Sequence, residues 1–496
     1  MAWKNRLRWR VAILICFVFT RSSVIRATTY FVAPGGSDIA DGKSPDHPWQ
    51  TLVRASAAPL KGDDEVLLRR GGVWHETLTL TAGGKPRHPI IFGAYGEGNR
   101  PCIDGGDQIA SAKFSAADSP NVYRAELDRK LESVWENLGP PLIPTQSPSQ
   151  VSARDGTFFC DGTWLYVHPA GGRDPHSGEV HYEIPDQDVC ITIGQSHVAL
   201  HSIAICHAGR TDRGAITVWA ENDLAGIEIQ DCDISYNRGR GVWFCGPPTS
   251  AIRDLLIAGN QFRGNDSCGI LMVLADGAEI RGNRFTQNCR LPIEPWQAAI
   301  RLWSGGIRDV LVAGNTISDQ RWGSPGDSSI GIHCDETGDH VTIRGNQIRD
   351  ADQSGIEVEN TRGVTVEKNS VIDCNIGILV NRAGHDHLIR GNTVVDSRAQ
   401  AISLQGLLAH GINAGPEILV DGRLLTHNLV ENNVTHGSRL AELKAINGGQ
   451  QIDPPLGNIF RENDFGPERP GFIEWGNQML DRYDQWPVND GSSHGK

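Results

Sequence analysis

The amino-acid sequence predicts an all-β chain whose short parallel strands stack into a solenoid, a parallel β-helix. A Gly-Asn or Lys-Asn pair recurs at spacings of 23, 32, 31, 23 and 23 residues, and such a period with insertions is typical of stacked repeats. Segments between the pairs, such as HVTIRGN and SGIEVEN, alternate polar and apolar residues without a helical period, which predicts short strands. The asparagines of these pairs are Asn260, Asn283, Asn315, Asn346, Asn369 and Asn392.

Residues 1–27 are predicted to be an export signal. Basic residues between Lys4 and Arg10 precede an apolar run from Val11 to Phe19, which is too short to span a bilayer. Ala27 is a plausible last residue before cleavage. No second long apolar segment follows, so we expect no stable membrane span and a secreted or periplasmic protein.

The rest of the chain divides into three parts. Residues 28–190 are expected to form an N-terminal cap and irregular first coils, with a hairpin at 157–169 that turns at Asp161-Gly162. Residues 191–468 carry the regular coils. Residues 469–496 no longer show the repeat and are expected to cap the last coil.

Two segments near the N-terminus, TTYFVAPGGSD (28–38) and GDDEVLLRRGGVWHETLTL (62–80), precede the repeating coils. Together with those coils they resemble secreted right-handed parallel β-helix proteins of the pectate-lyase and polygalacturonase superfamily. The resemblance extends over residues 28–468 and implies a right-handed, single-stranded β-helix with an N-terminal cap. It does not define the reaction, because one fold hosts many functions. The paired NTD, DD, GHG and RIK motifs of polygalacturonases are absent from the sequence.

The recurring asparagine is predicted to stack as a hydrogen-bonded ladder along the solenoid axis. The same shape returns later as VENNV at Asn432 and RENDF at Asn463. This role is architectural, so we assign these asparagines no catalytic function.

One strand of each coil is expected to point alternate side chains away from the core, in two columns along the axis. The first column is predicted to contain Thr217, Trp243, Leu271, Arg301, His333, Glu357, Leu379 and Ser403. The second is predicted to contain Trp219, Cys245, Val273, Trp303, Asp335, Glu359, Asn381 and Gln405.

The columns place two acidic side chains, Asp335 and Glu359, on neighbouring coils. Paired strands lie about 4.8 Å apart, so one carboxyl of the pair should have a raised pKa. A sheet surface without a function would avoid this arrangement. The predicted catalytic residues are Asp335, Glu359, Glu357 and His333.

Two insertions in the repeat, residues 290–297 and 320–328, each precede a strand that carries a column residue. We expect them to wall a groove over the columns. Flat tryptophan faces stack on sugar rings, while amide and guanidinium groups bind sugar hydroxyls. The predicted substrate-binding residues are Arg301, Trp303, Asn381, Gln405, Trp296 and Trp322.

These features favour hydrolysis of a glycosidic bond in a polysaccharide or oligosaccharide. Carboxyl groups about 5–5.5 Å apart suit a retaining glycosidase. We assign Asp335 as nucleophile or base and Glu359 as general acid, because Glu359 is longer and is crowded by Glu357. The more distant diagonal pair of Asp335 and Glu357 would suit inversion. The layout is similar to that of β-helix glycoside hydrolases such as the xylosidase and fucosidase families, which have acid pairs on adjacent coils.

Two other function classes fit the same residues. The first is a polysaccharide lyase or epimerase that acts on uronic acids; it needs a base, for which the columns offer only Arg301. In that case Asp335, Glu357 and Glu359 are candidates to bind Ca²⁺ through their oxygens. The second is a non-catalytic carbohydrate-binding protein. The hydrolase interpretation requires neither a metal nor a cofactor.

The net charge and the cysteine content limit the kinds of binding partner and the disulfides that we expect. The net charge of −13 argues against nucleic acid as a partner. Ten of the eleven cysteines lie outside the signal, are spread singly and form no CxxC pair. We expect them to behave as small buried residues with few or no disulfides. The expected protein is a monomer that binds a polysaccharide or oligosaccharide.

Overall fold

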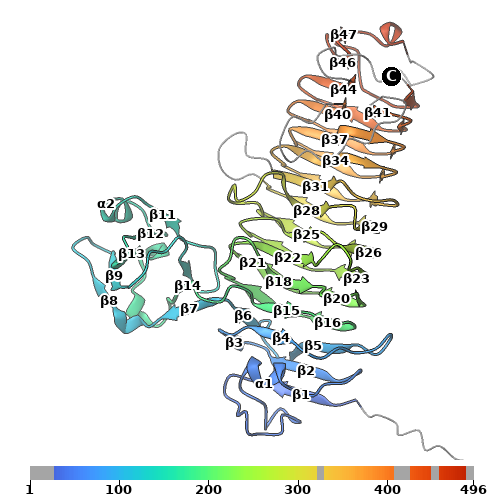
Figure 1. Cartoon of the computed structure of the whole chain (residues 1–496). Helices are drawn as coiled ribbons and strands as arrows, with labels where there is room; N and C mark the ends of the chain where they lie inside the picture. Colours follow the sequence, from blue (N-terminus) through green and yellow to red (C-terminus); the bar gives the residue numbers. More distant parts are fainter. Residues whose placement is uncertain (1–26, 321–328, 407–424, 448–456, 488–496) are drawn as a thin grey trace, which may run out of the picture.

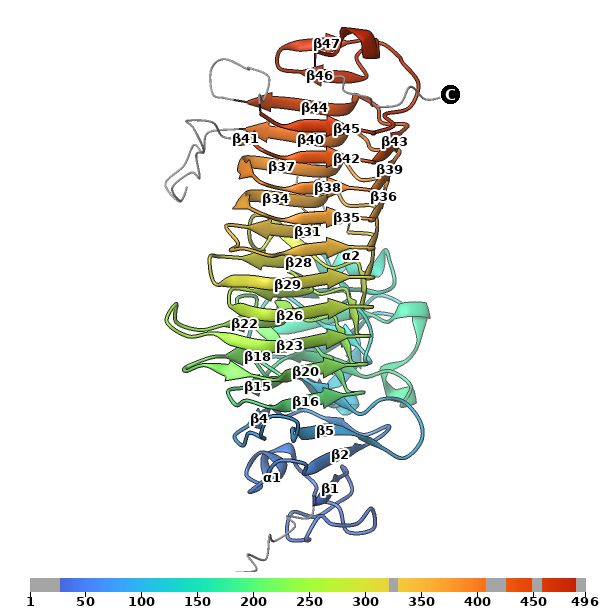
Figure 2. The ribbon, with the colours of Figure 1, turned by 90° about the vertical axis from the view of Figure 1, so that its right-hand side faces the viewer.

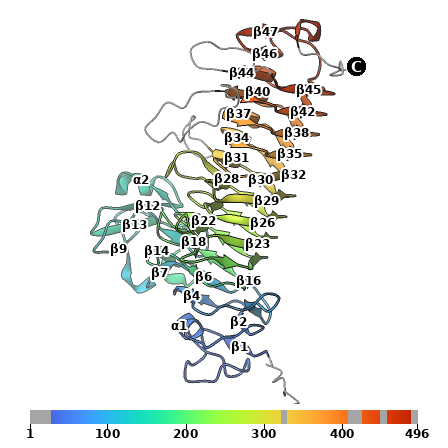
Figure 3. The ribbon, with the colours of Figure 1, turned by 45° about the vertical axis from the view of Figure 1, so that its right-hand side comes forward.

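The computed structural model describes residues 27–320, 329–406, 425–447 and 457–487. They form a long stack of coils, with a smaller domain standing beside the lower coils (Figures 1 and 3). Three long parallel sheets run the length of the stack, which confirms the predicted parallel β-helix. Within the described ranges, no helix is long and apolar enough to cross a membrane.

Each coil contributes one short strand to each sheet, which we call sheets 1, 2 and 3. Sheet 1 contains, in order, β1 (Thr29–Val32), β2 (Glu65–Arg69), β5 (Ile90–Tyr95), β16 (Val198–His201), β20 (Ile227–Gln230), β23 (Ile252–Ala258), β26 (Ala275–Arg281), β29 (Ile307–Ala313), β32 (Thr342–Arg344), β35 (Thr365–Glu367), β38 (Leu388–Arg390), β42 (Leu429–Glu431) and β45 (Ile459–Arg461), with β19 (Leu224–Ala225) beside β23. Sheet 2 contains β4 (Leu78–Leu80), β15 (Ile191–Ile193), β18 (Gly214–Trp219), β22 (Arg240–Cys245), β25 (Ile270–Met272), β28 (Gln297–Trp303), β31 (Ser329–Asp335), β34 (Ser354–Arg362), β37 (Ile376–His385), β40 (Gln400–Gly406), β44 (Ala441–Asn447), β46 (Ile473–Trp475) and β47 (Gln478–Leu480), with β41 (Leu425–Thr426) beside β37. Sheet 3 contains β3 (Val73–Trp74), β6 (Cys102–Asp104), β17 (Ala204–Cys206), β21 (Asp233–Ser235), β24 (Gln261–Arg263), β27 (Arg284–Thr286), β30 (Thr316–Ser318), β33 (Gln347–Arg349), β36 (Ser370–Ile372), β39 (Thr393–Val395) and β43 (Val434–His436).

The interior of the coils is filled by one continuous apolar cluster. Alternate residues of each strand point inward, so on β31 Ile332 and Cys334 belong to this core. Phe262 and Phe285, one coil apart, stack with ring centroids 4.6 Å apart. Each of the ten cysteines in the described part of the chain is a buried free thiol, and several of them, such as Cys374, lie in this core.

Residues 106–185 leave the stack and form the side domain, which has its own apolar core. It contains β7 (Gly106–Ile109), β8 (Phe114–Ala116), β9 (Tyr123–Glu126), β10 (Trp135–Glu136), β11 (Ile143–Pro144), α2 (Pro148–Ser152), β12 (Thr157–Cys160), β13 (Trp164–His168) and β14 (Tyr182–Pro185). The predicted hairpin is present as the antiparallel pair β12–β13. Its turn uses Gly162 in the left-handed region, with φ 103°.

Both ends of the solenoid are covered. At the N-terminal end, helix α1 (Leu52–Ser56) buries Leu52 and Ala55 under the first coils. At the C-terminal end, β47 pairs antiparallel with β46. The buried rings of Tyr483 and Trp486 close this end, and the Tyr483 hydroxyl contacts the backbone of residues 465 and 466.

A buried asparagine ladder runs along the axis, as predicted. Asn346 Nδ2 donates to Val312 O at 2.9 Å and to Asn369 Oδ1 at 3.0 Å, and Asn346 Oδ1 accepts from the backbone and side chain of Asn315. The ladder continues past Asn392 to Asn433 and Asn463. The placement of Asn432 in the ladder is wrong by one residue, because Asn432 has φ 53° and takes the left-handed turn position that glycine holds in earlier coils.

Two shorter ladders were not predicted. One joins Asn237, Asn265 and Asn288, and the other joins Asn428 to Asn458. They follow the same rule, in which a buried amide bonds to the equivalent amide of the next coil. Their sequence signal is weaker because they extend over fewer coils.

Replacing Asn346 with Ala should lower the free energy of unfolding by about 2–4 kcal/mol, since each buried group left without a partner costs about 1–3 kcal/mol. Urea denaturation measures this change. The matched control is Asn222→Ala at an exposed loop position, which should change stability by less than about 0.5 kcal/mol. An unchanged midpoint for Asn346→Ala, or lost activity at full stability, would contradict an architectural role.

Candidate active site

The two predicted columns exist with the predicted register on the outer face of sheet 2. Strand pairing aligns Arg301, His333, Glu357, Leu379 and Ser403, and beside them Trp303, Asp335, Glu359, Asn381 and Gln405. Figure 2 shows the strands that carry them, β28, β31, β34, β37 and β40, stacked in order.

The acidic part of the columns is buried, although it faces away from the core. Asp335 is 7% exposed and Glu359 is 4% exposed, while His333 and Glu357 are 0% exposed. These side chains are therefore not ordinary solvent-exposed residues of a sheet surface. Charged groups at this depth require partners.

The 290–297 insertion lies against the first column. Arg301 Nη1 donates to Pro295 O at 3.2 Å. Glu294 of the same loop accepts hydrogen bonds of 2.6 Å from Arg240 and from Ser267, which holds the loop over sheet 2. Trp296 at the end of this loop is 44% exposed. Most of the second insertion, with Trp322, lies outside the described residues.

Asp335 and Glu359 lie side by side on β31 and β34. One oxygen of each carboxyl and a ring nitrogen of His333 lie within 4.8 Å of one another. Arg301 Nη2 is 3.4 Å from Asp335 Oδ2, and Arg382 Nη1 is 3.5 Å from Glu359 Oε1. His333 Nε2 is 3.3 Å from Glu359 Oε2, an ion-pair distance without hydrogen-bond alignment. Each carboxyl thus has its own arginine.

The surroundings perturb the two carboxyls in opposite directions. Burial raises the pKa of Asp335, despite the opposing charges of His333 and Arg301. Burial alone would also raise the pKa of Glu359, but His333 and Arg382 outweigh it and hold that pKa below its ordinary value. The prediction that one acid of the pair has a raised pKa is confirmed, and the assignment of that acid to Glu359 is wrong. The reasons are His333, whose effect on Glu359 is the larger, and Arg382, which contacts Glu359 from outside the predicted columns.

Glu357 lies behind this pair and is tightly held. Its Oε2 accepts from Gln353 at 2.9 Å and from Ser354 at 2.6 Å, and Asn381 Nδ2 is 3.4 Å from its Oε1. Burial raises the pKa of Glu357. Because Glu357 is adjacent to His333 in the register, its position suits support of His333 rather than contact with a substrate.

His333 is the central cation of the cluster. Burial by itself would lower the pKa of its imidazole, but the neighbouring Glu359, Glu357 and Asp335 outweigh burial and raise it. A protonated His333 between three carboxyls reduces their mutual repulsion, which allows the acids to be stacked in register.

The predicted sugar-binding side chains surround the acids. Trp303 is adjacent to Asp335 in the register and is 41% exposed, with the Arg301 guanidinium 5.2 Å from its ring centroid. Asn381 is adjacent to Glu359 on the next strand, and Gln405 follows one coil further. An exposed indole beside a buried acid is an arrangement that suits stacking of a sugar ring.

Sequence reasoning missed Arg382, Gln353 and Ser354. Arg382 directly follows Asn381 but has φ 60°, so the alternation that defines the columns does not apply to it. Ser354 is the first residue of β34 and Gln353 directly precedes it, and both side chains donate to Glu357. Their closeness in sequence to Glu357 was the only available signal.

His333, Asp335 and Glu359 also form a group with the right atoms to hold a metal ion. Ca²⁺ takes six to eight oxygen ligands, so a set that includes an imidazole nitrogen fits it poorly. Both carboxyls are also paired with arginines, which would compete with any cation. His333, Asp335 and Glu359 are therefore better suited to act as a pair of catalytic acids with a neighbouring histidine than to bind the Ca²⁺ ion that a lyase would need.

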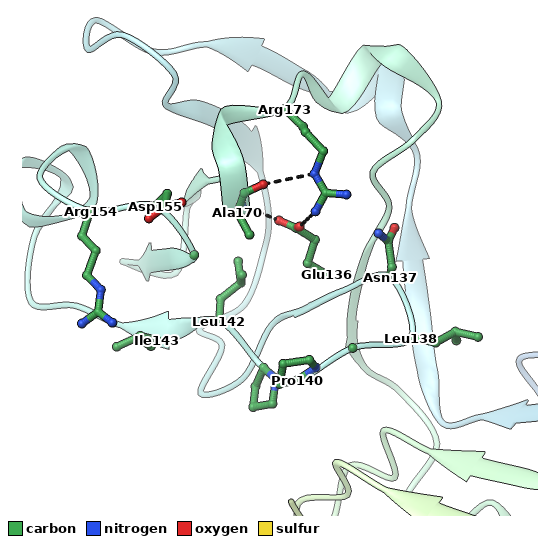
Figure 4. A pocket seen from close by; sticks show the side chains of 13 residues that line it. Glu136, Asn137, Leu138, Pro140, Leu142, Ile143, Arg154, Asp155, Ala170 and Arg173 are labelled. Carbon is green, nitrogen blue, oxygen red and sulfur yellow. Dashed lines mark hydrogen bonds and ion pairs between the residues drawn. The ribbon is translucent and has the colours of Figure 1, made fainter.

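A cavity of about 640 Å³ lies elsewhere, in the side domain (Figure 4). Its acid, Glu136, is paired with Arg173 and accepts hydrogen bonds from the backbone of Ala170 and the hydroxyl of Tyr182. Leu142, Ile143 and several prolines line the rest. A second acid, Asp155, also lines the cavity, and its Oδ2 accepts from the backbone N–H of Gly171 at 2.9 Å. Because Glu136 is engaged with Arg173, Ala170 and Tyr182, this pair suits glycoside hydrolysis less well than Asp335 and Glu359.

Comparison with known proteins supports the fold. The family model "Right handed beta helix region" matches residues 206–317 and 255–434, so the chain contains a right-handed parallel β-helix, with the predicted hand. A comparison with curated proteins gave no match.

Several solved structures are similar to this chain, and the descriptions of three of them name a bound sugar or a glycoside-cleaving enzyme. A structure described as "the complex structure of XylC with xylose" is 14% identical, with 88% of this chain and 83% of that chain covered and a TM-score of 0.60. A structure described as a glycoside hydrolase is 11% identical, with 88% and 97% covered and a TM-score of 0.54. The GH136 lacto-N-biosidase from Eubacterium ramulus is 15% identical, with 90% and 68% covered and a TM-score of 0.52. At these identities the similarity establishes the fold alone.

The buried cluster should make stability depend on pH. The folded pKa of His333 lies above its ordinary value of 6.5, so its contribution is complete below pH 6.5 and is lost as the pH rises through the folded pKa. The raised pKa values of Asp335 and Glu357 give the same direction. We expect His333→Gln to reduce the gain in melting temperature between pH 8 and pH 5.5.

Thermal unfolding by circular dichroism at the two pH values tests this expectation. The control is His436→Gln, because His436 is exposed at the end of β43 and should leave the pH dependence unchanged. The interpretation of His333 as a buried cation is wrong if its replacement leaves the same difference between the two pH values.

Proposed function

We propose that this chain is an exported glycoside hydrolase that cleaves a polysaccharide or oligosaccharide with retention of configuration. The observation that carries the proposal is the pair Asp335 and Glu359, buried side by side with oppositely perturbed pKa values. Retaining glycosidases need one carboxylate and one carboxylic acid about 5–5.5 Å apart. Oxygens of this pair lie within 4.8 Å of each other.

The charged neighbours of Asp335 and Glu359 support a different catalytic role for each acid. Glu359 has a lowered pKa and two cationic neighbours, His333 and Arg382, so it is ionised and acts as the nucleophile that bonds to the anomeric carbon. Asp335 has a raised pKa, which favours its protonated form, so in this proposal it supplies the proton to the departing glycosidic oxygen. In the second step, Asp335 accepts a proton from the water that attacks the glycosyl-enzyme bond, which releases Glu359.

The flanking side chains support a saccharide as the substrate. Trp303 offers an exposed aromatic face next to Asp335, and Asn381 and Gln405 place amides on the following strands. The columns run along the axis, so a saccharide chain can be held over several coils. The solved glycoside hydrolases with the same fold support this substrate class.

Export is part of the proposal because polymeric saccharides are degraded outside the cytoplasm. The basic and then apolar N-terminal sequence supports it. Cleavage after Ala27, read by mass spectrometry of protein collected from the exported fraction, is the direct check.

A polysaccharide lyase or epimerase remains the alternative class. The candidate bases of the described cluster are Arg301, which lies 3.4 Å from Asp335, and His333, whose pKa is raised by its three acidic neighbours so that its protonated form is favoured. A protonated imidazole does not abstract a proton from a uronic acid. The geometry therefore favours hydrolysis.

Glu359→Gln should lower kcat by at least about 10³-fold on every substrate, because no nucleophile remains. Asp335→Asn should lower kcat by about 10²–10⁴-fold on natural glycosides. The loss should be much smaller for aryl glycosides with good leaving groups, since these depart without a proton. Reducing-end release from a polysaccharide panel and NMR of the first-formed anomer provide the readouts.

The matched control is Glu279→Gln, which changes an exposed acid on sheet 1 and should retain full activity. Inverted products would replace the retaining mechanism. Products with a new ultraviolet-absorbing double bond would replace hydrolysis by elimination. Full activity in both acid variants would show that Asp335 and Glu359 are not catalytic.

A further inference from the structure

A second cluster of potential metal ligands lies where the side domain joins the solenoid, several coils below β31 (Figure 1). On β6, Ile103 points into the core, so Asp104 faces outward; on β17, Ile205 points inward and Cys206 outward. Strand pairing places Cys206 directly beside Asp104. Segments about a hundred residues apart in the sequence thus present their polar side chains at one point.

The ligand atoms converge. An oxygen of Asp104, the sulfur of Cys206 and a ring nitrogen of His207 lie within 4.8 Å of one another, and all three residues are buried. His207 Nδ1 is 3.0 Å from Asp104 Oδ1. The sulfur of Cys102 is 3.4 Å from that of Cys206, which adds a further soft donor at the edge of the cluster.

His207 is held in the orientation that a metal ligand needs. Its Nε2 is 3.2 Å from Gly139 O, and Trp135 stacks on its ring with centroids 4.6 Å apart. Both ring nitrogens therefore face oxygen acceptors, yet a neutral imidazole has only one N–H. If Nε2–H donates to Gly139 O, Nδ1 presents a lone pair toward Asp104. Metal-bound histidines commonly donate their other N–H to a backbone carbonyl in this way.

Two buried carboxyl oxygens at this junction have no hydrogen-bond partner in the described part of the chain, Asp104 Oδ2 and Glu183 Oε2. Burial and the nearby Asp104 raise the pKa of Glu183 to about 9, so Asp104 is the carboxylate of the two. Both residues crowd Gly106: a Cβ on that glycine would lie 3.2 Å from Asp104 Oδ1 and 2.8 Å from Glu183 Cβ. Unsatisfied carboxylate oxygens are costly in the interior. A cation bound by Asp104 removes that cost for Asp104 Oδ2.

We propose that Asp104, Cys206 and His207 bind a divalent transition-metal ion of the zinc class, with Cys102 as the nearest further donor. Thiolate and imidazole ligands select such ions over Ca²⁺ and Mg²⁺, which prefer oxygen. One carboxylate and one thiolate neutralise a divalent charge. All three ligands belong to the solenoid, on β6, on β17 and directly after β17, so the metal joins two neighbouring coils, and the side-domain residues Trp135 and Gly139 orient His207.

The test uses the full chain with Co²⁺ or Zn²⁺ alone as probes. We expect one equivalent of Co²⁺ to bind with a sulfur-to-cobalt charge-transfer band, Zn²⁺ to displace it, and X-ray absorption to find sulfur in the cobalt shell. Cys206→Ser and His207→Gln should each lose the band and the bound equivalent. Cys245→Ser, which changes a buried thiol on the outer face of sheet 2, should keep both.

His333→Gln separates this site from the candidate active site, since it should keep the sulfur-containing spectrum. Circular dichroism at the same temperature reports whether each variant is folded. If the ligand variants do not fold, the X-ray absorption of the wild-type chain decides alone. A cobalt shell of nitrogen and oxygen only, unchanged binding in both ligand variants, or a Cys102–Cys206 disulfide found by mass spectrometry in the purified chain would overturn the proposal.

Discussion

The in-register pairing of parallel strands is the constraint on which the rest of the structure depends. Each residue of a coil lies on the equivalent residue of the next coil, so any side chain that recurs in the sequence also recurs in space. Inward positions become a continuous apolar core, and turn asparagines become ladders such as Asn260 to Asn463. Outward positions become the columns that hold Asp335 and Glu359.

This constraint explains why the columns were predictable. Once the repeat period is known, strand alternation and register place Arg301, His333 and Glu357 in one line. The apolar partners of these residues confirm the direction, since Ile332 and Cys334 face the core. No side-chain packing is needed for this inference.

The rest of the candidate site depends on contacts that periodicity does not specify. Arg382 itself has a left-handed backbone conformation, which interrupts the alternation of side chains along β37 and lets its side chain contact Glu359. That contact adds to the larger effect of His333 in lowering the pKa of Glu359, so the opposite pKa shifts of Asp335 and Glu359 could not be read from periodicity alone. The shift from Asn432 to Asn433 has a similar origin, because two adjacent asparagines share one turn and only backbone conformation separates their roles. The Asp104 and His207 cluster depends on the pairing of β6 with β17. The whole side domain separates these two strands in the sequence, so no local sequence pattern predicts their pairing.

The covered ends of the stack have a consequence for self-association. An uncapped β-helix ends in three open strand edges that would accept another copy and extend into a fibre. Here the last strand of sheet 2 is the short antiparallel β47, and the rings of Phe465, Trp475 and Trp486 fill the opening above the final coil. Helix α1 covers the opposite end. The same pairing that extends the coil within one molecule is thereby stopped at its boundaries, so the length of the solenoid is set by the sequence and not by assembly.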